Sequence, residues 1–405
     1  MSLAPDPLRV RLSAFFFLVA MPLGMWIVPM GNIMAAYGRE NLLPWMLAAS
    51  AMTTFISPLV VGAMADQRVT PTVLMGWMCV ATAGVLVGLC RVIETGGGTV
   101  AILSWAVVLA LVSSPIWSLS TTIVLSHLEQ PGRQFGPVRA WATVGWMAGG
   151  WMVSWVLHSD ASVISGYAAA GFWLVAAVWS WTLPRTRPPD QVERRSWREV
   201  MGLDAVRLLG DRNHRMVFIT AALYTIPLAA FYPYCVMHLR ALGVPGQAAV
   251  LSLGQITEIL TMLGLARLMV RFRLKWVFLS GIGFGLLRYV VFAVGGAGWV
   301  VVGILVHGLA YTLFFITTQI YLEERIERRW RGRAQALLTM LTSGVGNTSG
   351  YLLSGLWFAH CSQPGAGEAD WRLFWGGLAV VVAVVLVQFA WLYKGQTSSA
   401  ESSAG

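Results

Sequence analysis

A glutamine and a glutamate interrupt the apolar stretch VLSLGQITEILTMLGLARLMV at residues 250–270. Gln255 and Glu258 are three residues apart, so their side chains share one face of a helix. Apolar surroundings disfavour the charged form of a carboxylate, which can then take up and release a proton near neutral pH. We interpret Glu258 as a proton-carrying and ligand-binding group. The alternative is a structural acid held by an arginine, for which Arg288 is the candidate partner.

Arg288 is itself a charge inside an apolar stretch, LLRYVVFA at 286–293. Besides pairing with Glu258, its long side chain could extend to the lipid headgroups while its stem stays in apolar surroundings. We favour a structural or gating role, including an ion pair, over contact with a ligand.

His307 and Tyr311 are four residues apart in LVHGLAYTLFFITTQIYLEE, at 305–324, and share a helix face. Imidazole titrates near physiological pH, and tyrosine offers a ring with a hydroxyl. The pair favours a ligand site; the alternative for His307 is a packed side chain with its hydrogen bonds satisfied.

Arg139, Thr143 and Trp146 form one stripe, because they lie at positions i, i+4 and i+7 of a helical stretch. If the stripe faces a cavity, Arg139 is a strong hydrogen-bond donor to a polar ligand. If it does not, Arg139 marks the cytoplasmic end of that helix.

Two prolines, Pro227 and Pro233, interrupt the apolar stretch at 226–239 and break its helical hydrogen bonding. Interrupted helices often mark the binding site of a transporter. The spacing does not decide which of the nearby rings faces inward; they are Phe231, Tyr232 and Tyr234.

The elements that carry these residues are too apolar for a soluble protein. The chain has 405 residues, of which 57% are hydrophobic and 11% charged, whereas about a quarter are charged in soluble domains. A helix of about 20 residues crosses ~30 Å of hydrocarbon. Twelve stretches of that kind predict an all-α membrane protein, at 12–36, 43–65, 71–92, 98–126, 137–157, 163–183, 214–238, 246–269, 274–294, 297–322, 334–359 and 371–393.

The net charge of +10 is an orientation signal rather than evidence of nucleic-acid binding. Most Lys and Arg fall in alternate loops, which places both termini in the cytoplasm. Twelve helical spans indicate an inner, plasma-type membrane. Basic residues at this surface also attract anionic lipids. The spans contain no Ser/His/Asp set, metal-ligand spacing or phosphate-binding loop, so we expect no enzyme activity, metal or cofactor.

The spans divide into two sets of six around one long hydrophilic segment, a layout similar to that of the major facilitator superfamily. We expect an N-terminal bundle at 1–183, a cytoplasmic linker at 184–213, a C-terminal bundle at 214–394 and a disordered tail at 395–405.

The loop GAMADQR, at 62–68, resembles a loop motif of this superfamily. By that resemblance Asp66 sits near a helix end and pairs with a basic neighbour such as Arg68 in a gating role. Gln67 departs from the motif, which has a basic residue there.

The chain resembles the nucleoside:proton symporter family of this superfamily. The motifs that carry the resemblance are VRAWATVGW (138–146), MGLDAVRLL (201–209), GQITEIL (254–260), LLRYVVFA (286–293), HGLAYTLFF (307–315) and RGRAQALLTMLTSGVGN (331–347). It implies seven substrate contacts, namely Arg139, Thr143, Trp146, Gln255, Glu258, His307 and Tyr311, with Glu258 also coupling the proton. His307 stands where the family has Tyr, and Thr312 where Asp is common.

The resemblance implies proton-coupled nucleoside uptake by alternating access, in a chain that works as a monomer among membrane lipids. We keep two alternatives. The first is a proton symporter of the same fold for a sugar or a modified nucleoside. The second is a membrane sensor that binds a solute without transporting it.

Overall fold

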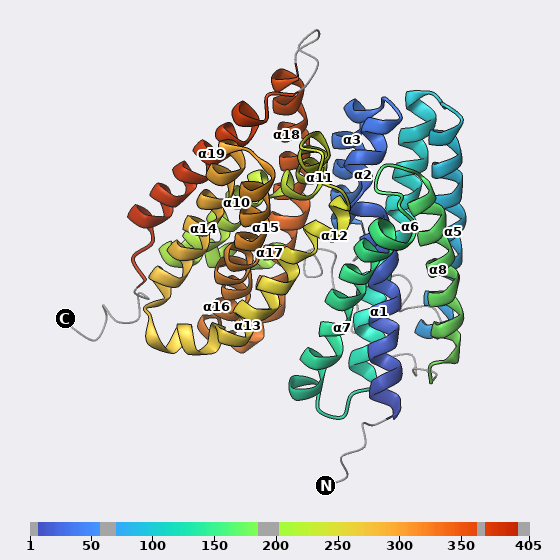
Figure 1. Ribbon diagram of the computed structural model, residues 1–405. Coiled ribbons are helices and arrows are strands. Elements are labelled where there is room, and N and C mark those ends of the chain that lie inside the picture. Colours follow the sequence, from blue (N-terminus) through green and yellow to red (C-terminus); the bar gives the residue numbers. More distant parts are fainter. Residues whose placement is uncertain (1–6, 57–69, 185–201, 363–368, 396–405) are drawn as a thin grey trace, which may run out of the picture. The chain divides into compact units, whose positions relative to one another are not determined.

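The computed structural model describes residues 7–56, 70–184, 202–362 and 369–395 (Figure 1). Within these residues the secondary structure is helical and contains no strand. Asp66 and Arg68, the predicted gating pair of the 62–68 loop, lie outside the described residues.

Nine stretches of the described chain are long and apolar enough to cross a membrane. They are Pro7–Ala36 (α1 Pro7–Ile27 with α2 Met30–Ala36), Pro71–Glu94 (α5), Thr99–Ser126 (α6), Ile164–Thr182 (α8), Arg212–Ala241 (α10 Arg212–Ala229 with α11 Phe231–Ala241), Gln247–Arg271 (α12 Gln247–Leu251 with α13 Leu253–Arg271), Leu274–Val294 (α14), Ala297–Arg325 (α15 Ala297–Tyr311 with α16 Thr317–Arg325) and Trp371–Leu392 (α19).

The other three expected spans are helical over their described residues. They correspond to α3 (Leu43–Met52), to α7 (Pro131–Trp151) with the π-helical turn Met152–Val156, and to α17 (Arg328–Thr339) with the π-helical turn Met340–Gly346 and α18 (Asn347–Cys361). Arginines, glycines and hydroxyl side chains make α7 and the α17–α18 segment less apolar than the other spans.

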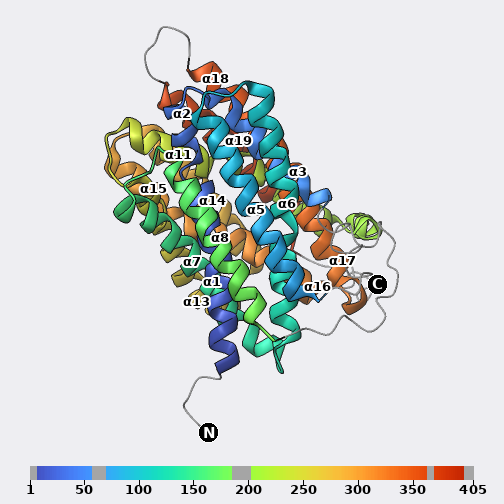
Figure 2. The same ribbon diagram turned by 90° about the vertical axis from the view of Figure 1, so that its right-hand side faces the viewer.

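The described chain forms two compact units, and the first comprises Met1–Arg194, Tyr232–Arg240 and Pro245–Val250. In this unit α1 packs against α7 and α8, and α5 packs against α6 and α8 (Figures 1 and 2). Glycine permits the closest of these contacts: a Cβ on Gly145 of α7 would lie 2.3 Å from the carbonyl oxygen of Phe17 in α1. Such small residues let membrane helices pack backbone to backbone.

The second unit comprises Arg195–Phe231, Ala241–Val244 and Leu251–Gly405. Here α14 packs against α15 and α19, α13 packs against α15, and α10 packs against α18 and α19. Phe278 of α14 lies at the centre of a ring cluster, with centroids 5.5–6.1 Å from those of Phe314, Tyr321, Phe389 and Tyr393.

The predicted helix break at Pro227 and Pro233 is confirmed, because α10 ends at Ala229 and α11 begins at Phe231. The Tyr289 hydroxyl of α14 donates a 2.6 Å hydrogen bond to the carbonyl oxygen of Pro227. The same carbonyl accepts from the backbone N–H of Ala230 at 3.2 Å, so the neighbouring helix adds a second hydrogen bond at the break.

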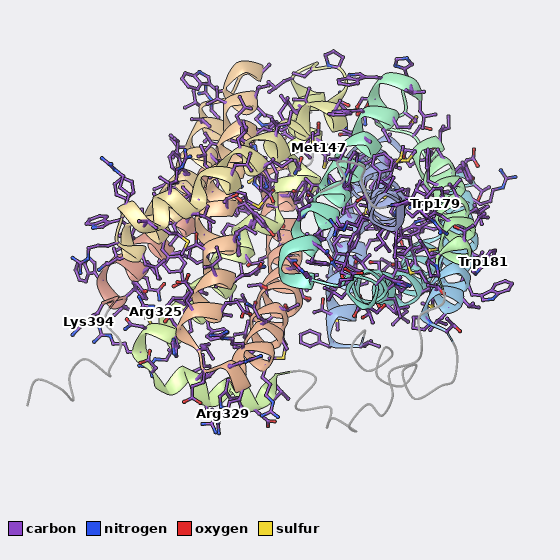
Figure 3. All side chains as sticks on the ribbon, turned by 90° about the horizontal axis from the view of Figure 1, so that it is seen from below. Met147, Trp179, Trp181, Arg325, Arg329 and Lys394 are labelled. Carbon is purple, nitrogen blue, oxygen red and sulfur yellow. The ribbon has the colours of Figure 1, made fainter. Side chains whose placement is uncertain are left out.

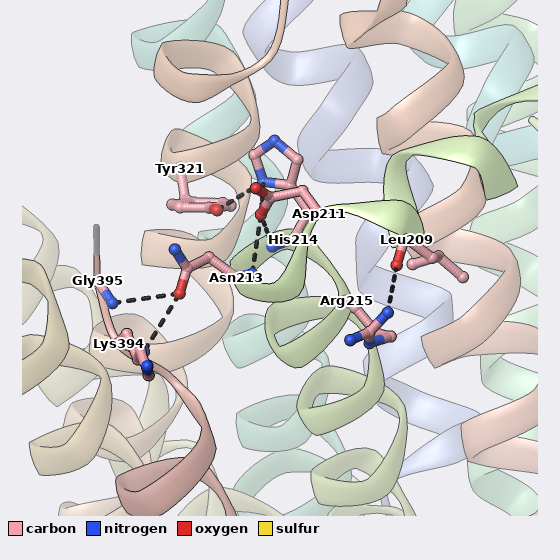
Figure 4. Close-up of polar contacts among 8 residues, drawn as sticks. All are labelled: Leu209, Asp211, Asn213, His214, Arg215, Tyr321, Lys394 and Gly395. Carbon is pink, nitrogen blue, oxygen red and sulfur yellow. Dashed lines mark hydrogen bonds and ion pairs between the residues drawn. The ribbon is translucent and has the colours of Figure 1, made fainter. Parts of the chain in front are cut away.

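A polar network anchors the first turn of α10 (Figure 4). The Asp211 carboxylate accepts hydrogen bonds from the backbone N–H groups of Asn213 (2.8 Å) and His214 (2.9 Å), which caps the helix. The Asn213 side-chain oxygen accepts from the backbone N–H groups of Lys394 and Gly395, both at 3.2 Å. This network therefore holds the chain after α19 against the start of α10.

The same end of the second unit is rich in basic side chains. Arg325, Arg329 and Lys394 project outward from it (Figure 3). The segment that leads into α10 forms a 3₁₀ helix at Leu203–Gly210, in the described part of the hydrophilic segment expected at 184–213. Arg207 of this segment lies over the Trp330 ring of α17, 3.2 Å from its centroid.

Candidate functional site

The sequence-predicted residues fall into one group in each unit. Those of the second unit are Gln255 and Glu258 on α13, Arg288 on α14, and His307 and Tyr311 on α15. Those of the first unit are Arg139, Thr143 and Trp146 on α7.

Two glycines bring α13 and α15 together at the first group. A Cβ on Gly308 would lie 2.1 Å from the backbone N of Glu258, so only glycine fits there. A Cβ on Gly254 would lie 3.3 Å from Cδ2 of His307. This close approach places the Gln255 and Glu258 backbone directly beside the His307 segment.

Gln255 and Glu258 differ in burial. Gln255 is 4% exposed, whereas Glu258 is only partly buried. The hydroxyl of Thr312 donates a hydrogen bond to the backbone carbonyl oxygen of Glu258 at 3.4 Å. This bond does not involve the Glu258 carboxylate. Thr312 begins a π-helical turn, Thr312–Ile316, a departure from the α-helix that is frequent at functional sites.

Arg288 is fully buried, at 0% exposure, so the alternative in which its side chain extends to the lipid headgroups is wrong. Its Nη1 lies 2.6 Å from Nδ1 of His307, which makes His307 rather than Glu258 its hydrogen-bond partner in the described chain. The guanidinium carbon is 5.0 Å from the ring centroid of Phe231 and 4.4 Å from that of Tyr289. Two ring faces therefore stabilise this buried charge.

His307 is also one member of a row of rings. Phe231 stacks on it with centroids 4.1 Å apart and an interplanar angle of 13°. The row continues on either side through the pairs Phe231–Phe292 (6.3 Å), His307–Tyr311 (6.0 Å), Tyr311–Phe315 (5.3 Å) and Phe315–Tyr224 (5.5 Å). Tyr311 and Phe315 are partly exposed, so the row offers ring surface to a flat ligand.

The group in the first unit is built around Arg139. Its guanidinium carbon lies 4.4 Å from the ring centroid of Trp117 and 5.9 Å from that of Phe16, and the side chain is partly buried. Thr143 lies one turn further along α7 and is partly buried. Trp146 meets the Tyr232 ring edge to face at 6.0 Å.

A second polar cluster in the first unit joins the end of α7 to the start of α12. The Asp160 carboxylate accepts hydrogen bonds from the Ser154 hydroxyl and from the backbone N–H of Ala248, both at 2.8 Å. Ser154 in turn accepts from the backbone N–H of Ala249 at 3.0 Å. A cavity of about 500 Å³ lies beside the cluster and is also lined by Arg240.

Sequence reasoning did not find several of these contacts. Phe231 was one of three rings whose direction was open, and its stack on His307 follows from its position at the helix break. Trp117 is one of 20 tryptophans, and nothing in its local sequence marks it as the partner of Arg139. In the described residues no group of three or more His, Cys, Asp or Glu side chains is placed to hold a metal ion.

The described chain has the major facilitator fold. A crystal structure of a mutant of the nucleoside transporter NupG matches it with a TM-score of 0.87 and 22% identity, covering 96% of this chain and 100% of that one. The predicted fold class is thereby confirmed.

The chain belongs to the nucleoside H⁺ symporter family, whose model matches residues 7–398. It is 25% identical to the xanthosine permease of Escherichia coli K12 over 403 residues, covering 93% of this chain and 94% of that protein. It is 26% identical to the nucleoside permease NupG of the same organism over 291 residues, covering 66% and 69%. The family prediction is confirmed, and proton-coupled nucleoside transport is the function of this chain.

Proposed function

We propose that this chain imports nucleosides with protons by alternating access and that the group on α13 and α15 carries the coupling. The observation that supports this most is the position of Glu258. Glu258 is a partly buried residue, and its helix packs directly against the helix that carries His307 and Tyr311. Proton binding and ligand binding can therefore influence one another.

The ring row suits the base of a nucleoside. A base presents a flat face, and aromatic stacking on such a face contributes about 1–3 kcal/mol per base in nucleic-acid complexes. Tyr311 and Phe315 supply partly exposed rings for that contact. The amide of Gln255 and the carboxylate of Glu258 suit the vicinal hydroxyls of a ribose, which both donate and accept hydrogen bonds.

We also propose that Arg139, Thr143 and Trp146, on α7 of the first unit, contact the substrate. Trp117 and Phe16 hold the Arg139 guanidinium over their faces, and this fixes the direction of its donors. A fixed guanidinium suits the carbonyl oxygens of a base, because arginine donates two parallel hydrogen bonds.

Glu258 is the proton carrier in this proposal. It binds a proton on the outer side together with the nucleoside and releases both inside. One charge that crosses 100 mV is worth about 2.3 kcal/mol. That energy sustains roughly 40-fold accumulation of a neutral solute per proton.

We further propose that the chain works as a monomer in the inner membrane with both termini in the cytoplasm. Arg325, Arg329 and Lys394 all project from the end of the second unit that carries the residues after α19, which agrees with the positive-inside rule. Anionic lipids would contact this basic end.

The test is uptake of labelled uridine and adenosine into proteoliposomes under an inward proton gradient. Gradient-dependent accumulation that unlabelled nucleosides compete away, and that maltose does not, supports the proposal. Uptake that maltose abolishes, or no nucleoside uptake by correctly folded protein, would count against it.

A further inference from the structure

The hydrogen bond between Arg288 and His307 determines which ring nitrogen of His307 carries a proton. Nη1 of Arg288 lies 2.6 Å from Nδ1 of His307. A guanidinium has five N–H donors and no acceptor, and it stays protonated in proteins. Nδ1 must therefore accept this bond through its lone pair, so it carries no proton. The ring proton is then on Nε2, and the imidazole is neutral.

We propose that Arg288 is a positioning residue that holds His307 as the neutral tautomer with its proton on Nε2. In that state His307 donates one hydrogen bond from Nε2 and takes no part in proton coupling, which is left to Glu258. The tautomer does not depend on the proposed function. The statement about proton coupling does rest on it, because it assigns the coupled proton to Glu258.

Two contacts hold the ring of His307 in one orientation, and its Cδ2 edge faces Gly254 of α13. Phe231 stacks on its face at 4.1 Å, and Arg288 occupies its Nδ1 side. Its Cδ2 atom lies 3.3 Å from the position of a Cβ on Gly254 in α13. Nε2 is bonded to Cδ2 and lies on the edge of the ring away from Nδ1. The Nε2–H group is therefore on the side of the ring that faces α13, the helix of Glu258.

The charged and titratable groups around His307 come from three other elements. Arg288 is the cation on α14, and Tyr224 of α10 lies within electrostatic range of it. Glu258 on α13 has its backbone N against Gly308, the residue after His307. Tyr311 lies one turn further along α15. A second positive charge on His307 would face the buried guanidinium directly, and like charges at hydrogen-bond distance disfavour protonation.

Arg288 has remaining donors beyond this bond. Among the described residues its Nε and Nη2 are buried without a hydrogen-bond partner, although both are N–H donors. Arg288 is 0% exposed and His307 is 1% exposed, so the pair is sealed within its unit. The ring faces of Phe231 and Tyr289 take the place of a counter-ion. Among the described residues, the one hydrogen bond that the Arg288 guanidinium makes therefore goes to His307.

Nitrogen-15 NMR of the full chain in lipid nanodiscs, labelled at histidine, tests the tautomer directly. The His307 signals are assigned by their loss in His307→Gln. We expect an unprotonated Nδ1 and a protonated Nε2 throughout about pH 5–8, where ordinary imidazole titrates. A wild-type spectrum with a proton on Nδ1, or with both nitrogens protonated in this range, would overturn the proposal whether or not the protein transports nucleosides.

Two variants then test the role of Arg288. Arg288→Met removes the donor, so we expect His307 to titrate and its nitrogen-15 signals to change with pH between about pH 5 and 8. Arg288→Lys keeps a cation that can donate but not accept a hydrogen bond. It should preserve the tautomer, and the His307 signals should stay independent of pH. A purely packing role for Arg288 predicts that neither variant changes the His307 signals, and an unchanged spectrum in folded Arg288→Met would refute the assignment.

Discussion

Glu258→Gln should separate nucleoside accumulation from nucleoside movement. The amide keeps the shape of the side chain but cannot carry a proton. The structure predicts that the substitution leaves the fold intact. The contacts that set the α13–α15 approach use the backbone of Glu258: its N lies against Gly308 and its carbonyl oxygen accepts from Thr312. Burial penalises a charged group, so replacing the partly buried Glu258 with a neutral amide adds no desolvation cost.

The magnitude follows from the charge that each cycle moves. With one proton per nucleoside, a potential of 100 mV sustains roughly 40-fold accumulation. In Glu258→Gln the ratio of internal to external nucleoside should fall to about one, while counterflow of labelled against unlabelled nucleoside continues at a similar rate. The loss in accumulation is then about 2 kcal/mol of coupling energy.

The assay is uptake and counterflow in matched proteoliposomes, with the thermal unfolding temperature measured on the same preparations. Glu324→Gln on α16 is the matched control, because its carboxylate is exposed and the change in charge is the same. The reasoning is refuted if Glu258→Gln still accumulates nucleoside above the external concentration, or if Glu324→Gln loses accumulation to the same extent.

Three further changes test other contacts. Gly308→Ala should lower the free energy of unfolding by about 1–3 kcal/mol, because its Cβ would meet the backbone N of Glu258 at 2.1 Å; chemical denaturation measures this, and Gly298→Ala, which has open space, should be nearly neutral. Arg139→Lys should raise the KM for nucleoside several-fold by losing the planar contact with Trp117, worth about 0.5–2 kcal/mol; an unchanged KM would place Arg139 outside the ligand site. Asp160→Ala leaves two donors without their acceptor and should cost about 1 kcal/mol of stability, read from the thermal unfolding temperature.

The helices and their polar residues could be predicted from the sequence because each is a local pattern. Apolar runs of about 20 residues define spans, and two prolines define the break between α10 and α11. Contacts between residues on different helices do not follow from a local sequence pattern. The sequence made Arg288 a candidate partner of Glu258, yet its hydrogen bond goes to His307, because helix rotation and close approach at glycines decide which faces meet.

The ring contacts show the same limit. The pattern around Pro227 left Phe231, Tyr232 and Tyr234 equivalent, since a break in the helix removes the period that would assign faces. In the structure Phe231 stacks on His307, whereas Tyr232 contacts Trp146. Neighbouring residues on the chain therefore serve different contacts, one in each unit.

Proton stoichiometry is where these observations combine. If Arg288 holds His307 neutral, the group on α13, α14 and α15 contains one carboxylate that can carry the proton, Glu258. The transporter should then move one proton per nucleoside, with a limiting accumulation near 40-fold at 100 mV, whereas two protons would sustain more than about a thousandfold. The membrane potential at which net nucleoside flux reverses, measured at fixed nucleoside and pH gradients, distinguishes these ratios. A reversal potential that requires two protons would mean that a second group titrates during transport, and His307 would be the first to re-examine.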